Sequence, residues 1–274
     1  MSDSAYLHGS APDEQRRLAR MNDLINAPLL RELRLGGGER ILDVGCGLAQ
    51  LTRAMAKEAG PAGCVIGIER DPRQLAEAKR LQEEAGDPSL LELRVGDALD
   101  LPLEDEEWAS FDLVVTRFLL EHLQDPLRAV RGMVRAARPS GRIVLADDDH
   151  PLLRPWPEIP GFLPLWSAYQ EAFRRLGNDP EIGKRLVALL HDAGAQPRRN
   201  TWGFFGSCAG SDDWEPMVEN LVGVLRTGRS TIEEHRLLAP EAFDYGMKEI
   251  ASWAKRPDAA LWYAFSVAEG VRPG

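Results

Sequence analysis

Short apolar runs alternate with helix-forming stretches between residues 39 and 146 of this 274-residue chain. Most of these runs are apolar at successive positions, which is the pattern of a strand that helices cover on both faces. Strands separated by helices of about ten or more residues form parallel βαβ units, so the sequence predicts a doubly wound α/β sheet. The expected strands are 40–44, 64–68, 91–95, 111–115 and 142–146, and the expected helices are 51–59, 72–85 and 126–137.

This alternation stops after Asp149, because residues 150–165 contain five prolines. We interpret residues 31–274 as one domain with two insertions, 151–182 and 207–257, that form a lid over the carboxyl edge of the sheet. Residues 1–30 are expected to form a separate helical arm. The later helices are expected at 165–176, 182–193, 213–226 and 240–254, and the later strands at 198–205 and 261–267.

Composition narrows the classes of partner. The formal net charge is -10, which opposes binding to a phosphate backbone and favours a small-molecule partner over nucleic acid. No apolar run approaches the length that spans a bilayer, and the first residues lack a basic segment followed by an apolar one, so we expect no membrane association and a cytoplasmic location. The three cysteines lack the spacing of a disulfide framework or a zinc site. The oligomeric state stays open, a homodimer included.

The strongest local signal is the glycine-rich turn between the first expected strand and its helix, residues 43–49 (DVGCGLA). Ligands of open α/β sheets bind where the strands end, beside the switch in strand order. Gly45 and Gly47 allow a tight turn and a close approach of a ligand to the backbone. The helix that follows presents free N–H groups at its start. We interpret the loop as a cofactor site, with a purely structural turn as the alternative.

Two acidic residues follow the next two strands. Glu69 ends the second strand, where a carboxylate can accept hydrogen bonds from the two hydroxyls of a ribose. Asp97 follows the third strand and can accept from the exocyclic amine of adenine, while the amide of Ala98 can donate to a ring nitrogen. Solvated strand ends are the alternative for both carboxylates.

Taken together, these stretches resemble the class I S-adenosylmethionine-dependent methyltransferases. The resemblance covers about residues 38–149 and rests on 41–47 (ILDVGCG), 65–69 (VIGIE), 96–98 (GDA), 111–114 (FDLV) and 120–123 (LEHL). It implies a seven-stranded sheet whose last strand, 261–267, is antiparallel. It also implies that Gly45 and Gly47 face the methionine part of S-adenosylmethionine, Glu69 the ribose and Asp97 the adenine. Asp43 would orient the glycine loop, or the cofactor's amino group through water.

Further residues enter the expected cofactor site more weakly. The stretches 6–9 and 176–183 are similar to a narrower bacterial subgroup, which implies that Tyr6 closes over the cofactor. The family's third glycine is Ala49 here, which costs little if its φ is negative, and the helix is expected to start there. A nicotinamide-binding turn would have a glycine at the position of Gln50, which weakens that alternative. The remaining expected contacts are Cys46, Gln50, Arg70 and Arg117.

Methyl transfer from a sulfonium is an in-line displacement in which the cofactor supplies the electrophile. The protein must align the acceptor, exclude water and, for a hydroxyl or ammonium acceptor, remove a proton. We therefore leave the catalytic residue unassigned, with Asp147, His150 and His122 as weak candidates for a base. The acidic run 147–150 is read as a solvated strand end, and we expect no metal. The sequence predicts methyl transfer to O, N or S of a small molecule. A non-catalytic cofactor-binding module and a nucleotide- or NAD-dependent enzyme are the alternatives.

Overall fold

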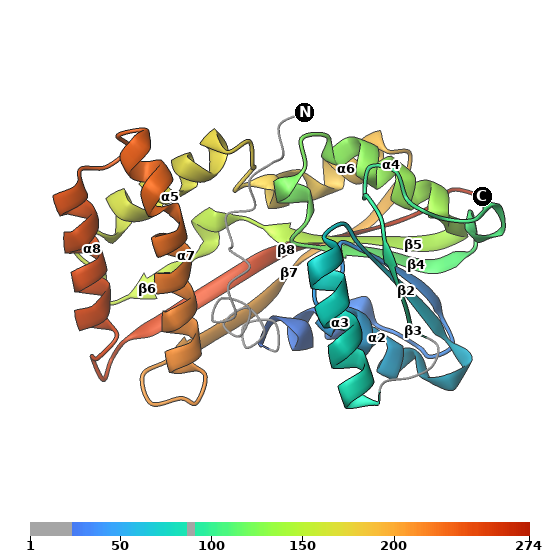
Figure 1. Ribbon diagram of the computed structural model, residues 1–274, viewed down its shortest axis with the longest axis horizontal. Helices are drawn as coiled ribbons and strands as arrows, with labels where there is room; N and C mark the ends of the chain where they lie inside the picture. Colours follow the sequence, from blue (N-terminus) through green and yellow to red (C-terminus); the bar gives the residue numbers. More distant parts are fainter. Residues whose placement is uncertain (1–23, 87–90) are drawn as a thin grey trace. The chain divides into compact units, whose positions relative to one another are not determined.

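The computed structural model describes residues 24–86 and 91–274, so Tyr6 and most of the expected N-terminal arm lie outside the described residues (Figure 1). The chain divides into two compact units. The sheet unit contains Asn26–Asp148, Ile182–Gly203 and Phe265–Gly274, and the helical unit contains Asp149–Glu181 and Phe204–Ala264. The two segments of the helical unit nearly coincide with the two expected insertions. Their action as a lid stays a prediction.

The sheet unit is built on five parallel strands in the order β3-β2-β1-β4-β5, as the sequence predicts. β8 pairs antiparallel with β5, and β7 pairs with β8, which gives the expected antiparallel last strand. The strand order reverses between β1 and β4, and this is where open α/β sheets bind ligands. The strands are β1 (Arg40–Val44), β2 (Cys64–Glu69), β3 (Leu91–Val95), β4 (Phe111–Arg117), β5 (Ala137–Asp148), β7 (Gln196–Cys208) and β8 (Ala260–Val271).

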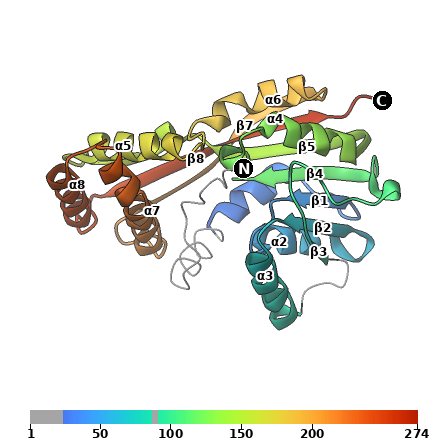
Figure 2. The ribbon, with the colours of Figure 1, turned by 45° about the horizontal axis from the view of Figure 1, so that its top comes forward.

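Helices cover both faces of this sheet, and Figure 2 shows α4 and α6 on one face and α2 and α3 on the other. Helix α3 begins as its sequence predicts, because the Asp71 carboxylate accepts from the amide of Arg73 at 2.8 Å and Pro72 takes the first helical position. Val130 and Met133 of α4 are fully buried against the sheet, each contributing about 1.5–3 kcal/mol. The helices are α2 (Gln50–Ala59), α3 (Pro72–Ala85), α4 (Pro126–Ala136) and α6 (Leu186–Asp192), with short 3-10 helices η1 (Gly60–Ala62), η2 (Asp105–Glu107), η3 (Leu120–His122) and η5 (Ile182–Arg185).

The helical unit has its own aromatic core, formed largely by α5. The rings of Phe162, Trp166 and Tyr169 stack in sequence along this helix, with centroids 6.0 and 5.3 Å apart. A Cβ at Gly228 of α7 would lie 2.7 Å from the Tyr169 ring, so the glycine allows the two helices to approach closely. The elements are η4 (His150–Leu152), β6 (Arg154–Trp156), α5 (Phe162–Arg175), α7 (Trp214–Glu234) and α8 (Pro240–Trp253).

Three details differ from the sequence-based expectation. Within the described residues the sheet has eight strands, because the three-residue β6 pairs with the first residues of β8. β5 begins at Ala137, and residues 138–141 bulge out of its pairing with β4, so the expected turn interrupts a strand. Residues 26–30 of the expected arm belong to the sheet unit, where Leu29 is fully buried. All helices in the described ranges are too short or too polar to traverse a lipid bilayer.

Candidate functional site

The glycine-rich turn after β1 depends on two left-handed residues, Gly45 at φ 79° and Gly47 at φ 55°. The amides of Gly45 and Cys46 both donate to the carbonyl of Ile68, at 2.8 and 2.9 Å, which ties the turn to β2. A Cβ at Gly45 would lie 2.9 Å from the side chain of Leu119. The backbone conformation and the close packing therefore both require glycine at this position.

Glu69 lies at the end of β2 with its carboxylate directed toward the glycine turn. Oε2 accepts from the amide of Gly47 at 3.0 Å, and Oε1 accepts from the amide of Asp71 at 2.8 Å. A carboxylate has about four lone-pair positions, so each oxygen can accept a second hydrogen bond from a hydroxyl group. The structure thus brings Glu69 and the expected methionine-binding turn together, and the ribose contact stays a prediction.

Asp97 and Ala98 follow β3, next to the end of β2. The amide of Gly96 donates to the Glu69 carbonyl at 3.0 Å, and this bond fixes the two strand ends side by side. Asp97 Oδ1 accepts from the amide of Leu99 at 2.9 Å, whereas Ala98 is buried in the core. The expected adenine contact of Asp97 therefore lies on the same edge as Glu69.

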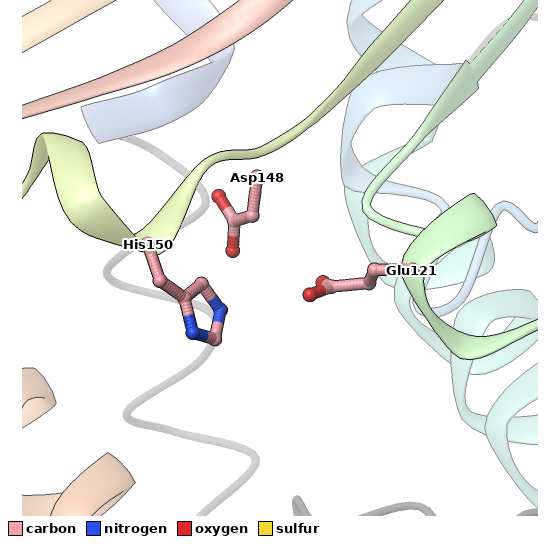
Figure 3. Close-up of side chains that lie close together, drawn as sticks. All are labelled: Glu121, Asp148 and His150. Carbon is pink, nitrogen blue, oxygen red and sulfur yellow. The ribbon is translucent and has the colours of Figure 1, made fainter. Parts of the chain in front are cut away.

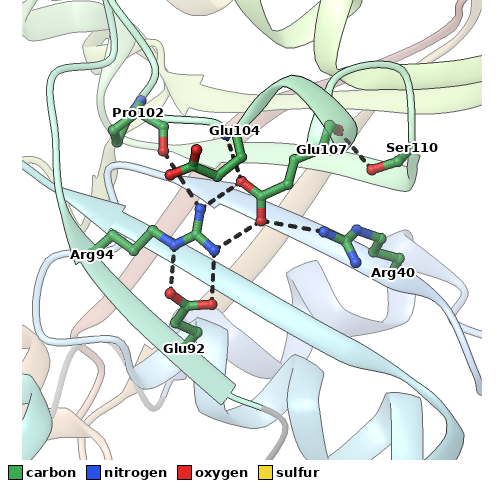
Figure 4. A network of polar contacts seen from close by, with 7 residues as sticks. All are labelled: Arg40, Glu92, Arg94, Pro102, Glu104, Glu107 and Ser110. Atoms are coloured by element: carbon green, nitrogen blue, oxygen red, sulfur yellow. Dashed lines mark hydrogen bonds and ion pairs between the residues drawn. The ribbon is translucent and has the colours of Figure 1, made fainter.

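A partly buried ion-pair network holds the loop that begins at Asp97 (Figure 4). The Arg94 guanidinium on β3 donates to Glu92 and, at 2.6 and 2.8 Å, to both carboxylate oxygens of Glu107 in η2. Arg40 of β1 adds a weaker contact to Glu107 at 3.4 Å. The bonded Arg94 guanidinium lowers the pKa of Glu107 below its ordinary value, which keeps the network charged. These bonds hold the loop in place next to Asp97, the expected adenine contact.

Asp43 is buried beneath the turn, and Thr52 of α2 donates to its Oδ2 at 2.7 Å. Burial raises the pKa of Asp43 to about 6, against the opposing effects of the Thr52 hydrogen bond and the Arg117 charge. Burial, together with the charges of Asp43 and Glu69, raises the pKa of the Cys46 thiol well above its ordinary value. A thiol with a raised pKa is less readily converted to the reactive thiolate, which opposes a role for Cys46 as a nucleophile.

Ala49 departs from the expectation of a negative φ. Its φ is 57°, it is fully buried, and it forms the N-cap of α2. A left-handed conformation costs an alanine roughly 1–2 kcal/mol that a glycine avoids. The substitution at the family's third glycine is therefore strained, and the expected low cost is wrong because the turn continues for one residue more than the sequence suggests.

The other expected contacts lie around this edge. Gln50 is the first residue of α2, and Arg70 is exposed just after β2. Arg117 ends β4, where its Nη1 donates to Oδ1 of Asn26 at 3.0 Å and its guanidinium lies 5.3 Å from the Phe118 ring. The charge of Arg117 lowers the pKa of Asp43. Arg117 ends β4, which lies on the other side of β1 from β2 and Glu69.

The three candidates for a base have different surroundings. Asp147 is fully buried, and its Oδ2 accepts from the amides of Leu119 and Leu120 at 3.2 and 2.8 Å. Burial and the nearby Glu121 and Asp148 raise the pKa of Asp147 well above its ordinary value. These contacts favour a role in holding the turn after β4 over a role as a base.

Both histidine candidates contact other residues. His122 Nε2 lies 3.5 Å from Oε1 of Glu121. His150 belongs to the helical unit, where its carbonyl accepts from Trp166 Nε1 at 3.1 Å and its ring stacks near Tyr169.

Sequence reasoning missed Glu121 as a possible site residue, although it lies within the matched stretch 120–123. In the sheet unit, carboxylate oxygens of Glu121, from η3, and Asp148, from the end of β5, lie within 4.8 Å of each other (Figure 3). Both strand ends belong to the carboxyl edge that carries the glycine turn. Glu121 and Asp148 therefore add two carboxylates to the carboxyl edge of the sheet beyond those of the expected site residues.

Comparisons with known proteins agree with this geometry. Residues 42–145 match the family model described as a methyltransferase domain. An uncharacterized 37.1 kDa protein in a transposon of Streptomyces fradiae is 33% identical over 57% of this chain and 43% of its own length. The demethylmenaquinone methyltransferase of Listeria welshimeri is 32% identical over 55% of this chain and 63% of its own length. This chain thus matches less than two thirds of either relative.

A solved structure gives an independent comparison of the fold. The S-adenosylmethionine-dependent methyltransferase of Aquifex aeolicus is 19% identical, with a TM-score of 0.54, over 70% of this chain and 93% of its own length. At this identity the likeness concerns the fold. Residues 42–145, which contain the glycine turn, Glu69 and Asp97, therefore match a methyltransferase domain.

Proposed function

We propose that this protein transfers a methyl group from S-adenosylmethionine to O, N or S of a small-molecule acceptor. The observation that carries the proposal is the grouping of three adjacent strand ends. The glycine turn of β1, the Glu69 carboxylate of β2 and Asp97 after β3 are joined by the bonds from Gly47 to Glu69 and from Gly96 to Glu69. No other described part of the chain offers this combination on neighbouring strands.

Each group has a role that its chemistry supports. Glu69 holds the two ribose hydroxyls through its remaining lone pairs, and Asp97 accepts from the adenine amine. Gly45 and Gly47 let the methionine part approach the backbone, above the Asp43–Thr52 link. S-adenosylmethionine supplies the electrophilic methyl group, so the protein's work is to align the acceptor and exclude water.

The acceptor is assigned here only as a small molecule. The family model ends at residue 145 and leaves out both segments of the helical unit. We assign acceptor recognition to that unit, because acceptor-binding segments vary while the cofactor half is kept. Demethylmenaquinone, the compound in the name of the Listeria relative, is a suitable first acceptor for a test.

Calorimetric titration of the full chain with S-adenosylmethionine, S-adenosylhomocysteine and NAD tests the cofactor. We expect the first two to bind and NAD to give no heat of binding. Binding of NAD alone would overturn the proposal. Turnover is then measured with a labelled methyl donor against hydroxyl, amine and thiol acceptors, and in a separate reaction against demethylmenaquinone, whose methyl group would be added to a ring carbon instead. Cofactor binding without transfer to any of these classes would favour a non-catalytic binding module.

A further inference from the structure

The helical segment 26–33 belongs to the sheet unit and is fastened to its strands at both ends. At the end of the segment, the carbonyl of Leu33 accepts from Nη2 of Arg142 on β5 at 2.6 Å. At its start, Oδ1 of Asn26 accepts from Nη1 of Arg117 on β4 at 3.0 Å. Asn26 is buried, with 8% of its surface exposed. A buried polar side chain at the start of the segment thus has a strand-end guanidinium as its partner.

The two fastening points lie at opposite ends of β4. Arg142 is paired near the start of β4, whereas Arg117 is the last residue of that strand. A helix from Asn26 to Leu33 rises about 10 Å, which is comparable with the roughly 13 Å that a strand rises over about four residues. The segment therefore spans the length of β4 and brings Asn26 to the carboxyl edge. The strand order reverses there, beside β1, and open α/β sheets bind ligands at that point.

Arg117 lies beside the glycine turn, because it ends β4 and β4 is the neighbour of β1. Its charge opposes the rise that burial produces in the pKa of Asp43, the carboxylate beneath the turn. Its guanidinium also lies 5.3 Å from the centroid of the Phe118 ring. An arginine side chain has many rotamers, and the bond to Asn26 together with the ring contact restricts them. The guanidinium is thus a preorganised positive charge at the turn.

Acidic side chains dominate the carboxyl edge of the described sheet unit, where Glu69, Asp97 and Asp148 each supply a carboxylate. The methionine part of S-adenosylmethionine carries one carboxylate beside an ammonium and a sulfonium group. Carboxylates at the edge attract the two cationic groups and repel the anionic one. The ligand's carboxylate therefore requires a cation, and a guanidinium is suited to it because it can donate two parallel hydrogen bonds.

We propose that Asn26 is a positioning residue for cofactor binding, which holds the Arg117 guanidinium where it takes the carboxylate of the methionine part. A guanidinium has more donors than the one that Asn26 occupies. Asn26 is uncharged, so it fixes the guanidinium without neutralising it, as an aspartate would. Fixing the cation beforehand lowers the entropy that is lost when the ligand binds. The identity of the ligand rests on the proposed function, which takes S-adenosylmethionine as the methyl donor.

Titration calorimetry of the full chain with two ligands tests the proposal. S-adenosylhomocysteine carries the carboxylate, and decarboxylated S-adenosylhomocysteine lacks only that group. We expect Arg117→Met to weaken S-adenosylhomocysteine by about tenfold or more and the decarboxylated ligand by less than about twofold, because only the first ligand loses charge-assisted hydrogen bonds. Asn26→Leu keeps the size of the side chain and removes the acceptor. It should weaken S-adenosylhomocysteine by about threefold to tenfold and leave the decarboxylated ligand nearly unchanged.

A double variant separates positioning from general stability. In the Arg117→Met background, Asn26→Leu should change neither affinity further, because Asn26 acts through Arg117. Glu32→Gln is the matched control, since it removes the charged partner of Arg199 at the other end of the same segment. It should leave the ratio of the two affinities as in the unmodified protein. Both ligands are titrated into the same sample, so a fraction of unfolded protein alters the stoichiometry and not this ratio.

The outcomes distinguish this proposal from the proposed function. Equal weakening of both ligands by Asn26→Leu would give Asn26 a merely structural role and overturn the proposal. Unchanged S-adenosylhomocysteine affinity in Arg117→Met, beside normal binding to the unmodified protein, would overturn it while the proposed function stands. The expected ratios without methyl transfer to any acceptor would refute the proposed function and leave Asn26 as a positioning residue. No binding of S-adenosylhomocysteine to the unmodified protein would overturn both.

Discussion

The carboxylate of Asp147 accepts a hydrogen bond from the amide of Leu120 at 2.8 Å, and this bond fastens the turn after β4 to the end of β5. The same turn begins at Phe118, which has a strained φ of 51°, and places the Leu119 side chain against Gly45. A buried acceptor that satisfies these amides keeps the strained turn in place. Asp147 is thus linked to the glycine loop through the turn that carries Leu119.

Replacing Asp147 with asparagine should weaken S-adenosylhomocysteine binding by up to about tenfold, because the two backbone hydrogen bonds that Asp147 accepts contribute roughly 0.5–1.5 kcal/mol each and only part of this reaches the glycine loop. Calorimetry measures the affinity, and Asp148→Asn is the adjacent control. Unchanged affinity with a loss confined to kcat would instead favour Asp147 as a base.

The Glu69→Ala variant should bind S-adenosylmethionine more weakly by about 1–3 kcal/mol, the typical worth of charge-assisted hydrogen bonds. Glu69→Gln keeps one accepting oxygen and should lose less. Both affinities can be measured by titration calorimetry. An unchanged dissociation constant in Glu69→Ala would count against the ribose contact.

Stability should depend on pH through Asp43. Its folded-state pKa of about 6 lies above the ordinary value of 3.8, so the folded protein holds this proton more tightly than the unfolded chain. The proton's contribution is complete below pH about 4 and is lost as pH rises through about 6, which amounts to about 3 kcal/mol at 1.36 kcal/mol per pKa unit. Asp43→Asn should therefore gain stability relative to the unmodified protein between pH 4 and pH 7 in urea unfolding. Parallel stability curves for the two proteins would show that Asp43 does not titrate in this range.

Ala49→Gly should raise the free energy of unfolding by about 1 kcal/mol, because glycine relieves the left-handed strain but loses more chain entropy on folding. The matched control is Ala54→Gly within α2, which should lower it by about 1 kcal/mol. Chemical denaturation measures both. Destabilisation by Ala49→Gly would mean that the methyl group's packing outweighs the backbone strain.

The strands and helices between residues 40 and 148 could be predicted because local pattern and tertiary structure agree there. Asp71 followed by Pro72 is an example, since cap and first helical residue are both visible in the sequence. β6 could not be predicted, because three residues that include Pro155 carry no strand signal and gain their pairing only from β8. The sequence also predicts β7 and β8 to end earlier than they do, at residues 205 and 267 instead of 208 and 271. The reason is the same, because pairing with a long partner extends a strand beyond its own apolar run.

The grouping of Gly45, Gly47 and Glu69 at one edge of the sheet was predictable, because these residues follow or end neighbouring strands. It was less so for residues whose role depends on depth. Asp147 looks like a solvated strand end in the sequence, yet it is fully buried and bonded to the backbone. Burial of a polar side chain is set by distant elements, which a linear pattern does not record.

Placement of β8 between β5 and β7 has a consequence for synthesis. Both β5 and β7 are synthesised before β8, so the edges of these two strands that pair with β8 stay unpaired until residue 271 has left the ribosome. Open strand edges are templates for unwanted pairing with other chains. The nascent protein therefore passes through a vulnerable interval that ends only when its final strand slides between two strands made earlier.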